Sequence, residues 1–167
     1  MSEVARFPGD VVITGSIIGI TGIAYPDGSI IDADINASAA ISASKCQRSV
    51  VVLVSQAGTA VTSTHLVHFC KGTTGTIKQV TVSNITACAG ASVVTVDVKK
   101  NAVTILSAVQ TLDSTTAAYS ENIPTISVSS LADGNYLTVH ITATASGTDT
   151  LASGVMCQIE IDEAYEA

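Results

Sequence analysis

The chain has 167 residues, of which 13% are charged and 47% hydrophobic, with a net charge of −7 and a mean hydropathy of +0.47. Seven Lys and Arg against 14 Asp and Glu form no clustered basic surface, so nucleic acid is not expected as a partner. Every apolar run is interrupted well short of the roughly 20 residues that span a bilayer, so no membrane association is expected. The acidic start lacks the basic and apolar regions of a secretion signal, which predicts synthesis and folding in a cytoplasm.

The length predicts one domain core with an appendage. A change of composition near Arg48 divides the chain into residues 1–48, an extended N-terminal arm with a short helix, and residues 49–167, an antiparallel β-sandwich. A surface with so few charges is covered either by Ser, Thr and Ala or by partner subunits, and the abundance of apolar residues favours subunits.

In the arm, short β-prone pieces are separated by glycines, and Ile-Thr-Gly occurs at both 13–15 and 20–22. Such pieces cannot form a core alone, but they can lie along another surface or wind with copies of themselves. We therefore expect the arm to bind partners through its apolar residues. These are Val11, Ile13, Ile17, Ile18, Ile20, Ile23, Tyr25, Ile30, Ile31 and Ile35.

The stretch 37–47 is rich in Ala and Ser, and its residues at helical spacing predict one short helix. Asn36 or Ser38 would cap it. The residues at that spacing are Ala40, Ile41, Ser44 and Lys45.

Residues 49–167 carry short strand signals at intervals of roughly eight to twelve residues, with no amphipathic helix between them, which predicts a sandwich or a barrel. The run 61–70 is rich in β-forming residues and is followed by a turn cluster at 71–75. In 76–82 the alternation places Ile77, Gln79 and Thr81 on one face, and Lys78, Val80 and Val82 on the other.

The segment 92–100 predicts a half-buried strand with Val94, Val96 and Val98 on its buried face. Asn101 and Ala102 follow as a tight hairpin turn, although Ala is a poorer second turn residue than Gly. Further strands are expected near 108–112, 115–119, 124–129, 136–144 and 154–161.

No catalytic, cofactor or metal site is predicted. His65 and His68 are three apart and point to opposite faces of a regular strand, so they cannot share a metal ion. The cysteines, at 46, 70, 88 and 157, have no metal-binding spacing, and we expect small buried residues, although a pair between Cys70 and Cys88 or Cys157 remains possible.

The acids near the end of the chain have no calcium-loop pattern and predict a solvated tail. They are Glu160, Asp162, Glu163 and Glu166. The nucleophile elbow of hydrolases is absent, which favours a protein that is not an enzyme.

The segment PDGSIIDADINASAAISASKCQ resembles a linker that recurs in structural proteins of tailed bacteriophages, with the pattern P-x-G-S-h-x-x-A-x-h-x-x-x-A-x-I-x-A-S-K-h. The stretches HFCKGTTGTIKQV, TVDVKKNAVTILSAVQTLDS and LADGNYLTVHITATASGTDTLASGVMCQIEIDE resemble the β-sandwich that follows it in head decoration (cement) or head-fibre proteins. The resemblance covers residues 26–163, and Ala102 departs from it where relatives tend to carry Gly.

The resemblance implies a jelly-roll-like domain, a homotrimer, and a place on the outside of the virion. The leading hypothesis is a capsid decoration protein that binds the major capsid protein through its arm and stabilises the phage head. The second is a head or tail fibre with a receptor-binding knob. The third, from a different class, is a tail-associated glycan-processing enzyme, which would need a cleft with paired carboxylates.

Overall fold

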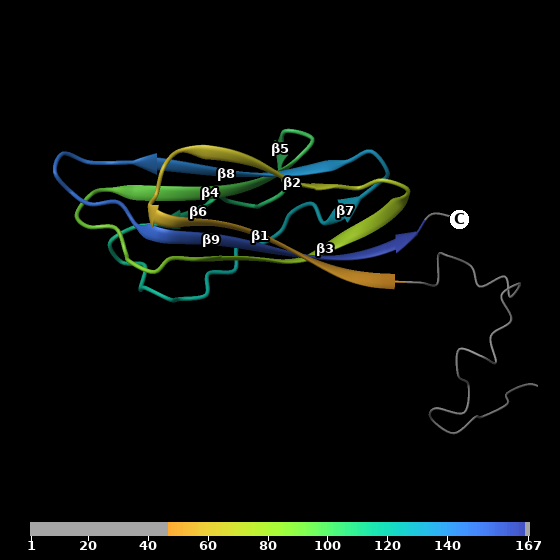
Figure 1. Ribbon diagram of the computed structural model, residues 1–167, viewed down its shortest axis with the longest axis horizontal. Helices are drawn as coiled ribbons and strands as arrows, with labels where there is room; N and C mark the ends of the chain where they lie inside the picture. The colour runs from red at the N-terminus through yellow and green to blue at the C-terminus, as the bar shows by residue number, and fades with distance from the viewer. Residues whose placement is uncertain (1–46, 166–167) are drawn as a thin grey trace, which may run out of the picture. The chain divides into compact units, whose positions relative to one another are not determined.

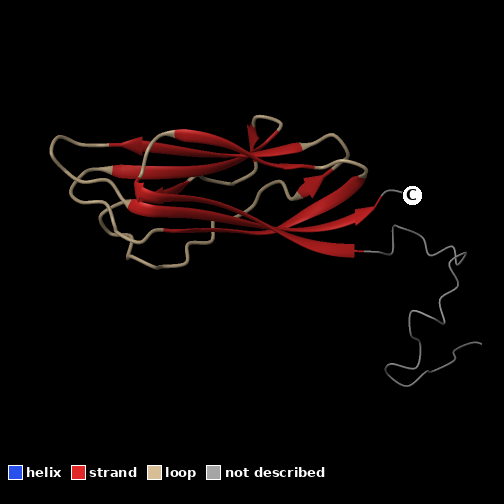
Figure 2. Cartoon of the chain, in the orientation of Figure 1, coloured by secondary structure: helices blue, strands red, loops and turns tan. Residues whose placement is uncertain are grey.

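A computed structural model of the chain describes residues 47–165. These residues form two antiparallel sheets with one core between them, and Figure 1 shows the sheets as two layers. Figure 2 shows strands and loops throughout this part of the chain, and no helix in it could span a membrane. The arrangement is all-β, consistent with the β-sandwich that the sequence predicts.

The first sheet has the order β1-β9-β3-β7. It consists of β1 (Gln47–Thr59), β9 (Ser153–Tyr165), β3 (Thr73–Ser83) and the short β7 (Ser130–Leu131). β9 pairs along most of its length with both β1 and β3, so the last strand of the domain is central in its sheet. β1 begins two residues before the predicted start of the sandwich, at Gln47.

The second sheet has the order β2-β8-β4-β5, with β6 also paired to β4. It consists of β2 (Ser63–Phe69), β8 (Tyr136–Thr144), β4 (Val93–Lys100), β5 (Val103–Thr104) and β6 (Gln110–Leu112). β1 and β2 each lie at the edge of their sheet, and they contact one another. One side of the sandwich is therefore bounded by these two consecutive strands.

Alternating apolar residues on the central strands build the core. Val94, Val96 and Val98 of β4 are fully buried, as predicted, and their neighbours in sequence are partly exposed. β8 and β9 contribute in the same way, with buried residues at every second position. These are Leu137, Val139, Ile141, Val155, Cys157, Ile159 and Ile161.

The predicted hairpin turn is confirmed. Lys100 pairs with Val103, and the two residues between them both have positive φ, 49° at Asn101 and 68° at Ala102. Two successive positive φ values are the signature of a type I′ turn, whose twist matches that of the flanking strands. Ala102 therefore occupies a position that favours Gly.

Two predicted strands are wrong. Residues 115–119 form a turn, because the Asp113 carboxylate accepts hydrogen bonds from the Thr115 amide (2.8 Å) and from the hydroxyls of Thr115 (2.7 Å) and Thr116 (3.3 Å). Such local side-chain bonds compete with strand pairing. Residues 124–129 form a loop with one isolated bridge, Leu106 to Ile126, and the Ser129 carbonyl oxygen accepts a 2.8 Å bond from the Ile77 amide of β3.

The predicted alternation in β3 is also wrong in part. The pairing with β9 shifts between Ile77 and Gln79, so Lys78 is an extra residue in the ladder. A bulge of this kind moves every later residue to the opposite face. Ile77 is consequently buried on the same face as Val80 and Val82 and not with Gln79.

A second bulge corrects the prediction for the two histidines of β2. The pairing with β8 shifts between Leu66 and His68. His65 therefore opposes Val139 and His68 opposes Leu137, both of which are buried. Directly opposed residues share a face, so both histidines lie on the inner face of the sheet and do not point to opposite faces.

The remaining sequence predictions divide at residue 47. The apolar arm residues from Val11 to Ile35 and the helix expected over 37–47 lie outside the described residues, except for Gln47, which begins β1. Cys70, Cys88 and Cys157 are free and buried, as expected for small apolar residues.

Candidate functional site

Large apolar side chains are exposed along the side of the sandwich bounded by β1 and β2. Val51 and Leu53 lie on β1, Leu66 and Phe69 lie on β2, and Val61 lies in the loop between the strands. Each is more than half exposed. We call this set the β1–β2 surface. Val51 and Leu53 point out of the first sheet and Leu66 and Phe69 point out of the second, so the exposed apolar side chains flank the open edge on both sides. Apolar side chains that gather on a surface are typical of interaction sites.

A groove of about 470 Å³ runs between the two strands, and Leu53 and Leu66 are among its lining residues. Apart from histidine, β1 and β2 together contain a single charged residue, Arg48. Edge strands are commonly protected by charges, prolines or covering segments, because their outer backbone groups can pair with another chain. The outer faces of β1 and β2 lack such charges, so this side is suited to contact with a protein.

Polar side chains lie on the inner side of the same edge. The Gln56 amide nitrogen donates a hydrogen bond to the Ser63 hydroxyl oxygen at 2.8 Å, and that hydroxyl is 2.9 Å from Nε2 of His65. Gln56 also accepts from the Val61 amide at 3.0 Å. These bonds satisfy the polar groups and fix the β1–β2 connection.

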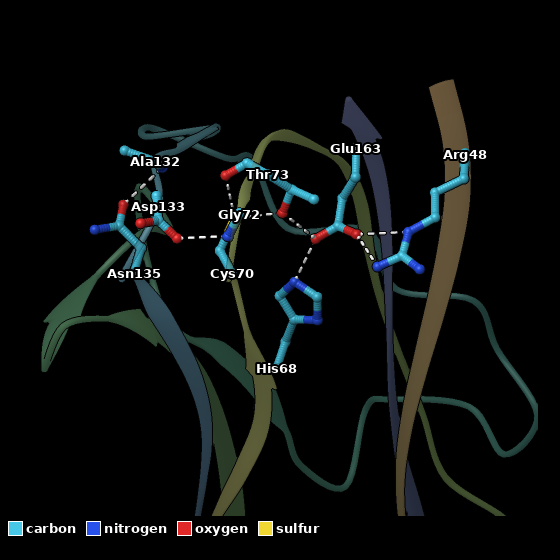
Figure 3. Close-up of polar contacts among 9 residues, drawn as sticks. All are labelled: Arg48, His68, Cys70, Gly72, Thr73, Ala132, Asp133, Asn135 and Glu163. Atoms are coloured by element: carbon cyan, nitrogen blue, oxygen red, sulfur yellow. Dashed lines mark hydrogen bonds and ion pairs between the residues drawn. The ribbon is translucent and has the colours of Figure 1, made fainter. Parts of the chain in front are cut away.

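The main polar cluster lies at the other end of β1, and Figure 3 shows its residues converging on one carboxylate. The side chain of Glu163 on β9 is 1% exposed and contacts polar side chains of three strands, one of them the Thr73 hydroxyl of β3, which donates to Oε1 at 3.5 Å. Arg48 of β1 donates from Nε at 2.9 Å and from Nη2 at 2.6 Å, both to Oε2. Nε2 of His68 on β2 lies 2.7 Å from Oε1. The cluster therefore connects the two sheets at their open edge.

The electrostatics of Glu163 follow from these contacts. Burial alone raises the pKa of the carboxyl group, because it disfavours the charged form. The hydrogen bonds from Arg48 and His68 and the attraction of both side chains outweigh burial, and the pKa lies below the ordinary 4.5. Glu163 is therefore a carboxylate at neutral pH, and its charge is part of the folded structure.

Cys70 completes this cluster from the turn between β2 and β3. Its Sγ is 3.1 Å from the Thr73 carbonyl oxygen, and it belongs to a residue with no solvent exposure. The ligand atoms of His68, Cys70 and Glu163 all lie within 4.8 Å of one another, so among the described residues this group could hold a metal ion.

The turn that carries Cys70 is held by the loop before β8 (Figure 3). The Cys70 amide donates to the Asn135 carbonyl oxygen, and the Gly134 amide donates to the Cys70 carbonyl oxygen, both at 2.8 Å. The Gly72 amide donates to Oδ1 of Asp133 at 2.6 Å, a bond that lowers the pKa of that carboxyl group. The position of the thiol is thus fixed by backbone bonds on both sides.

The sequence prediction for Glu163 is wrong. The acids near the end of the chain were expected to form a solvated tail, but β9 extends through Glu163, and the residue is buried. The signal was present in the alternation, because Ile159, Ile161 and Glu163 are separated by two positions each and share one face of a strand. Asp162, on the other face, is exposed enough to pair with Lys78 at 3.7 Å.

A second hollow, of about 440 Å³, lies near the opposite end of β1. Tyr119 lines it with a side chain that is 76% exposed and a backbone φ of 58°, an unusual conformation for a bulky residue. Asn84, also in the lining, is buried, and both polar atoms of its side chain have no hydrogen-bond partner within residues 47–165. Buried amides without partners are uncommon and attract polar ligands or water.

Comparison with known proteins assigns no family, because no protein-family model matches the chain and no curated protein is significantly similar to it.

Proposed function

We propose that the chain is a virion structural protein of a tailed bacteriophage, a decoration protein that binds the outside of the capsid as a homotrimer. The observation that carries this proposal is the β1–β2 surface. There, large apolar side chains are exposed on two edge strands, and these strands contain almost no charged residues. Burial of this surface between copies removes apolar area from water, which drives association.

The strand order supports the proposal. Successive strands alternate between the sheets, apart from the adjacent β4, β5 and β6, and the first and last strands pair. We infer from this order a jelly roll, with β5 and β6 together in the place of one strand. Jelly rolls occur in viral capsid proteins and in lectins, so the architecture suits a virion component without assigning its role.

The arm, residues 1–48, is proposed to bind the major capsid protein. Three arms on one trimer would attach at three points, which raises avidity above that of a single contact. Deletion of residues 1–36 is expected to abolish capsid binding while the trimer persists. Unchanged binding of the truncated protein to capsids would contradict this role.

The trimer is tested by native mass spectrometry of the full chain and two variants. Leu53→Asp places a charge in the middle of the β1–β2 surface and is expected to give monomers, because a buried unpaired charge is costly. Val103→Asp is the matched control, because Val103 is also more than half exposed but lies in the β4–β5 hairpin. A monomeric wild-type chain, or loss of the trimer in both variants alike, would refute this interface.

The hollow beside Tyr119 favours a second candidate, a head or tail fibre whose knob binds a receptor. An exposed aromatic ring that lines a hollow is suited to a sugar, which stacks on such rings. Copy number separates the two candidates. Quantitative mass spectrometry of purified virions should find hundreds of copies for a decoration protein, and about a dozen or fewer for a fibre.

A further inference from the structure

The cluster of His68, Cys70 and Glu163 combines three different metal-binding groups in one buried place. Glu163 and Cys70 are almost completely shielded, and the His68 side chain is 11% exposed. An imidazole nitrogen, a thiol sulfur and a carboxylate oxygen lie within 4.8 Å of one another. We propose that these three residues bind a zinc ion.

The donor set selects the class of metal. Zinc is bound in proteins by Cys sulfur, His nitrogen and carboxylate oxygen, in tetrahedral geometry. Calcium and magnesium take oxygen ligands almost exclusively, and a thiol and an imidazole exclude them here. Three protein ligands leave a fourth position, which a water molecule fills.

The distances require a small rearrangement. Tetrahedral zinc with bonds of roughly 2.0–2.3 Å separates its ligand atoms by about 3.4–3.6 Å. The His68 Nε2 to Glu163 Oε1 distance is 2.7 Å, that of a hydrogen bond, so these atoms must separate by less than about 1 Å. The metal then takes the place of the proton between them, and that proton leaves Nε2 for solvent. His68 binds as the neutral imidazole protonated on Nδ1, and the Cys70 thiol gives its proton to solvent.

The ligands match the charge of the ion. One thiolate and one carboxylate balance the two charges of zinc, and the Arg48 guanidinium leaves the whole group with a net charge of +1. Arg48 binds Oε2 of Glu163, so the metal would bind Oε1, which also accepts a 3.5 Å bond from the Thr73 hydroxyl. Hydrogen-bonded partners of this kind orient ligating carboxylates in metal sites.

The surroundings hold two of the ligands in place. Backbone bonds to Asn135 and Gly134 fix Cys70. Arg48 holds Glu163 through its two bonds to Oε2, and Gly75 lies opposite Glu163 on β3. A bound ion would connect β9 to the end of β2 and its turn, beside the first residues of β1.

The test uses the full chain, stripped with a chelator and titrated with cobalt(II) as a spectroscopic substitute for zinc. We expect one bound cobalt per chain and a thiolate-to-cobalt charge-transfer band. Zinc at about 100 times its Kd should raise Tm by roughly 5–10 °C. Cys88→Ser is the matched control, since Cys88 is also a buried thiol but donates to the Leu112 carbonyl oxygen in another part of the core. It should keep the band and the shift.

Cys70→Ser should lose the charge-transfer band and at least tenfold in cobalt affinity. His68→Gln should keep a thiolate band but also bind at least tenfold more weakly, and it provides the test if Cys70→Ser does not fold. Absence of the band in the wild-type chain would overturn the proposal. Retention of the band in Cys70→Ser, or equal loss in Cys88→Ser, would also overturn it, since either would place the thiolate elsewhere.

Discussion

Replacement of Glu163 by Gln tests whether its charge holds the open edge of the sandwich together. The substitution keeps the shape of the side chain and removes the negative charge that Arg48 and His68 contact. The bond with His68, whose side chain is 11% exposed, is worth about 1.5–3 kcal/mol, as is typical of hydrogen bonds to charged groups. Arg48 is 53% exposed, so its pair with Glu163 adds about 0–1 kcal/mol. The variant should therefore lose about 1.5–4 kcal/mol of unfolding free energy at pH 7.

The pH dependence provides a second, independent part of this test. The pKa of Glu163 is lower in the folded chain than its ordinary 4.5. Its contribution is therefore complete above about pH 4.5 and is lost as the pH falls through the folded value. Gln resembles the protonated acid, so the unfolding free energies of the variant and the wild type should converge in acid.

Urea denaturation measures both effects. Far-ultraviolet circular dichroism is the suitable signal, because the chain contains no Trp. A chelator in all samples removes any contribution from metal ions. Glu160→Gln is the matched control on the same strand, because Glu160 is partly exposed and accepts a 3.3 Å bond from Gln158, and its loss should cost less than about 0.5 kcal/mol. A Glu163→Gln penalty that does not change between pH 7 and acid would refute the electrostatic reasoning.

Three further predictions concern backbone conformation and burial. Ala102→Gly should raise the unfolding free energy by about 0.5–1 kcal/mol, measured in urea, because Ala102 has a φ of 68°; a loss would contradict the turn assignment. Gly154→Ala should lower Tm in a calorimetric scan by the equivalent of at least about 2 kcal/mol. Gly154 has a φ of 63°, and the new Cβ would lie 2.5 Å from two Ile85 carbons. An unchanged Tm would show that Ile85 moves without cost. Burial raises the pKa of the Cys157 thiol to about 12, so a thiol reagent should label Cys157 only at the rate of global unfolding. Peptide mass spectrometry measures the labelling rate. Labelling faster than global unfolding would indicate local opening.

The fold was predictable from the sequence where the residues of a strand alone show which of its faces is buried. Val94, Val96 and Val98 alternate with polar residues, and the hairpin after them has two turn residues between clear strands. The strands at 136–144 and 154–161 were recognisable for the same reason, although β9 continues to Tyr165. In these segments local pattern and tertiary pairing agree.

The candidate site was not predictable, because it depends on pairing between strands that are distant in sequence. The bulges at Lys78 and after Leu66 exist only relative to β9 and β8, so the inward direction of His65 and His68 follows from register. The sequence predicted a solvated acid at Glu163, because its partner Arg48 is 115 residues away and no local pattern connects the two. The one local signal of its burial was that Glu163 continues the alternation of two buried isoleucines on the same face of β9.

The pairing of β1 with β9 has a mechanical consequence. The strands are antiparallel, and Gln47 lies opposite Ala164, so the chain enters and leaves the domain at the same end of this pair. A force that separates these two ends acts across the ladder and breaks its hydrogen bonds one after another, starting beside Arg48 and Glu163. A pull on the chain ahead of Gln47 would therefore peel β1 from this end, and the ion pair of Arg48 with Glu163 would be the first side-chain contact to resist it.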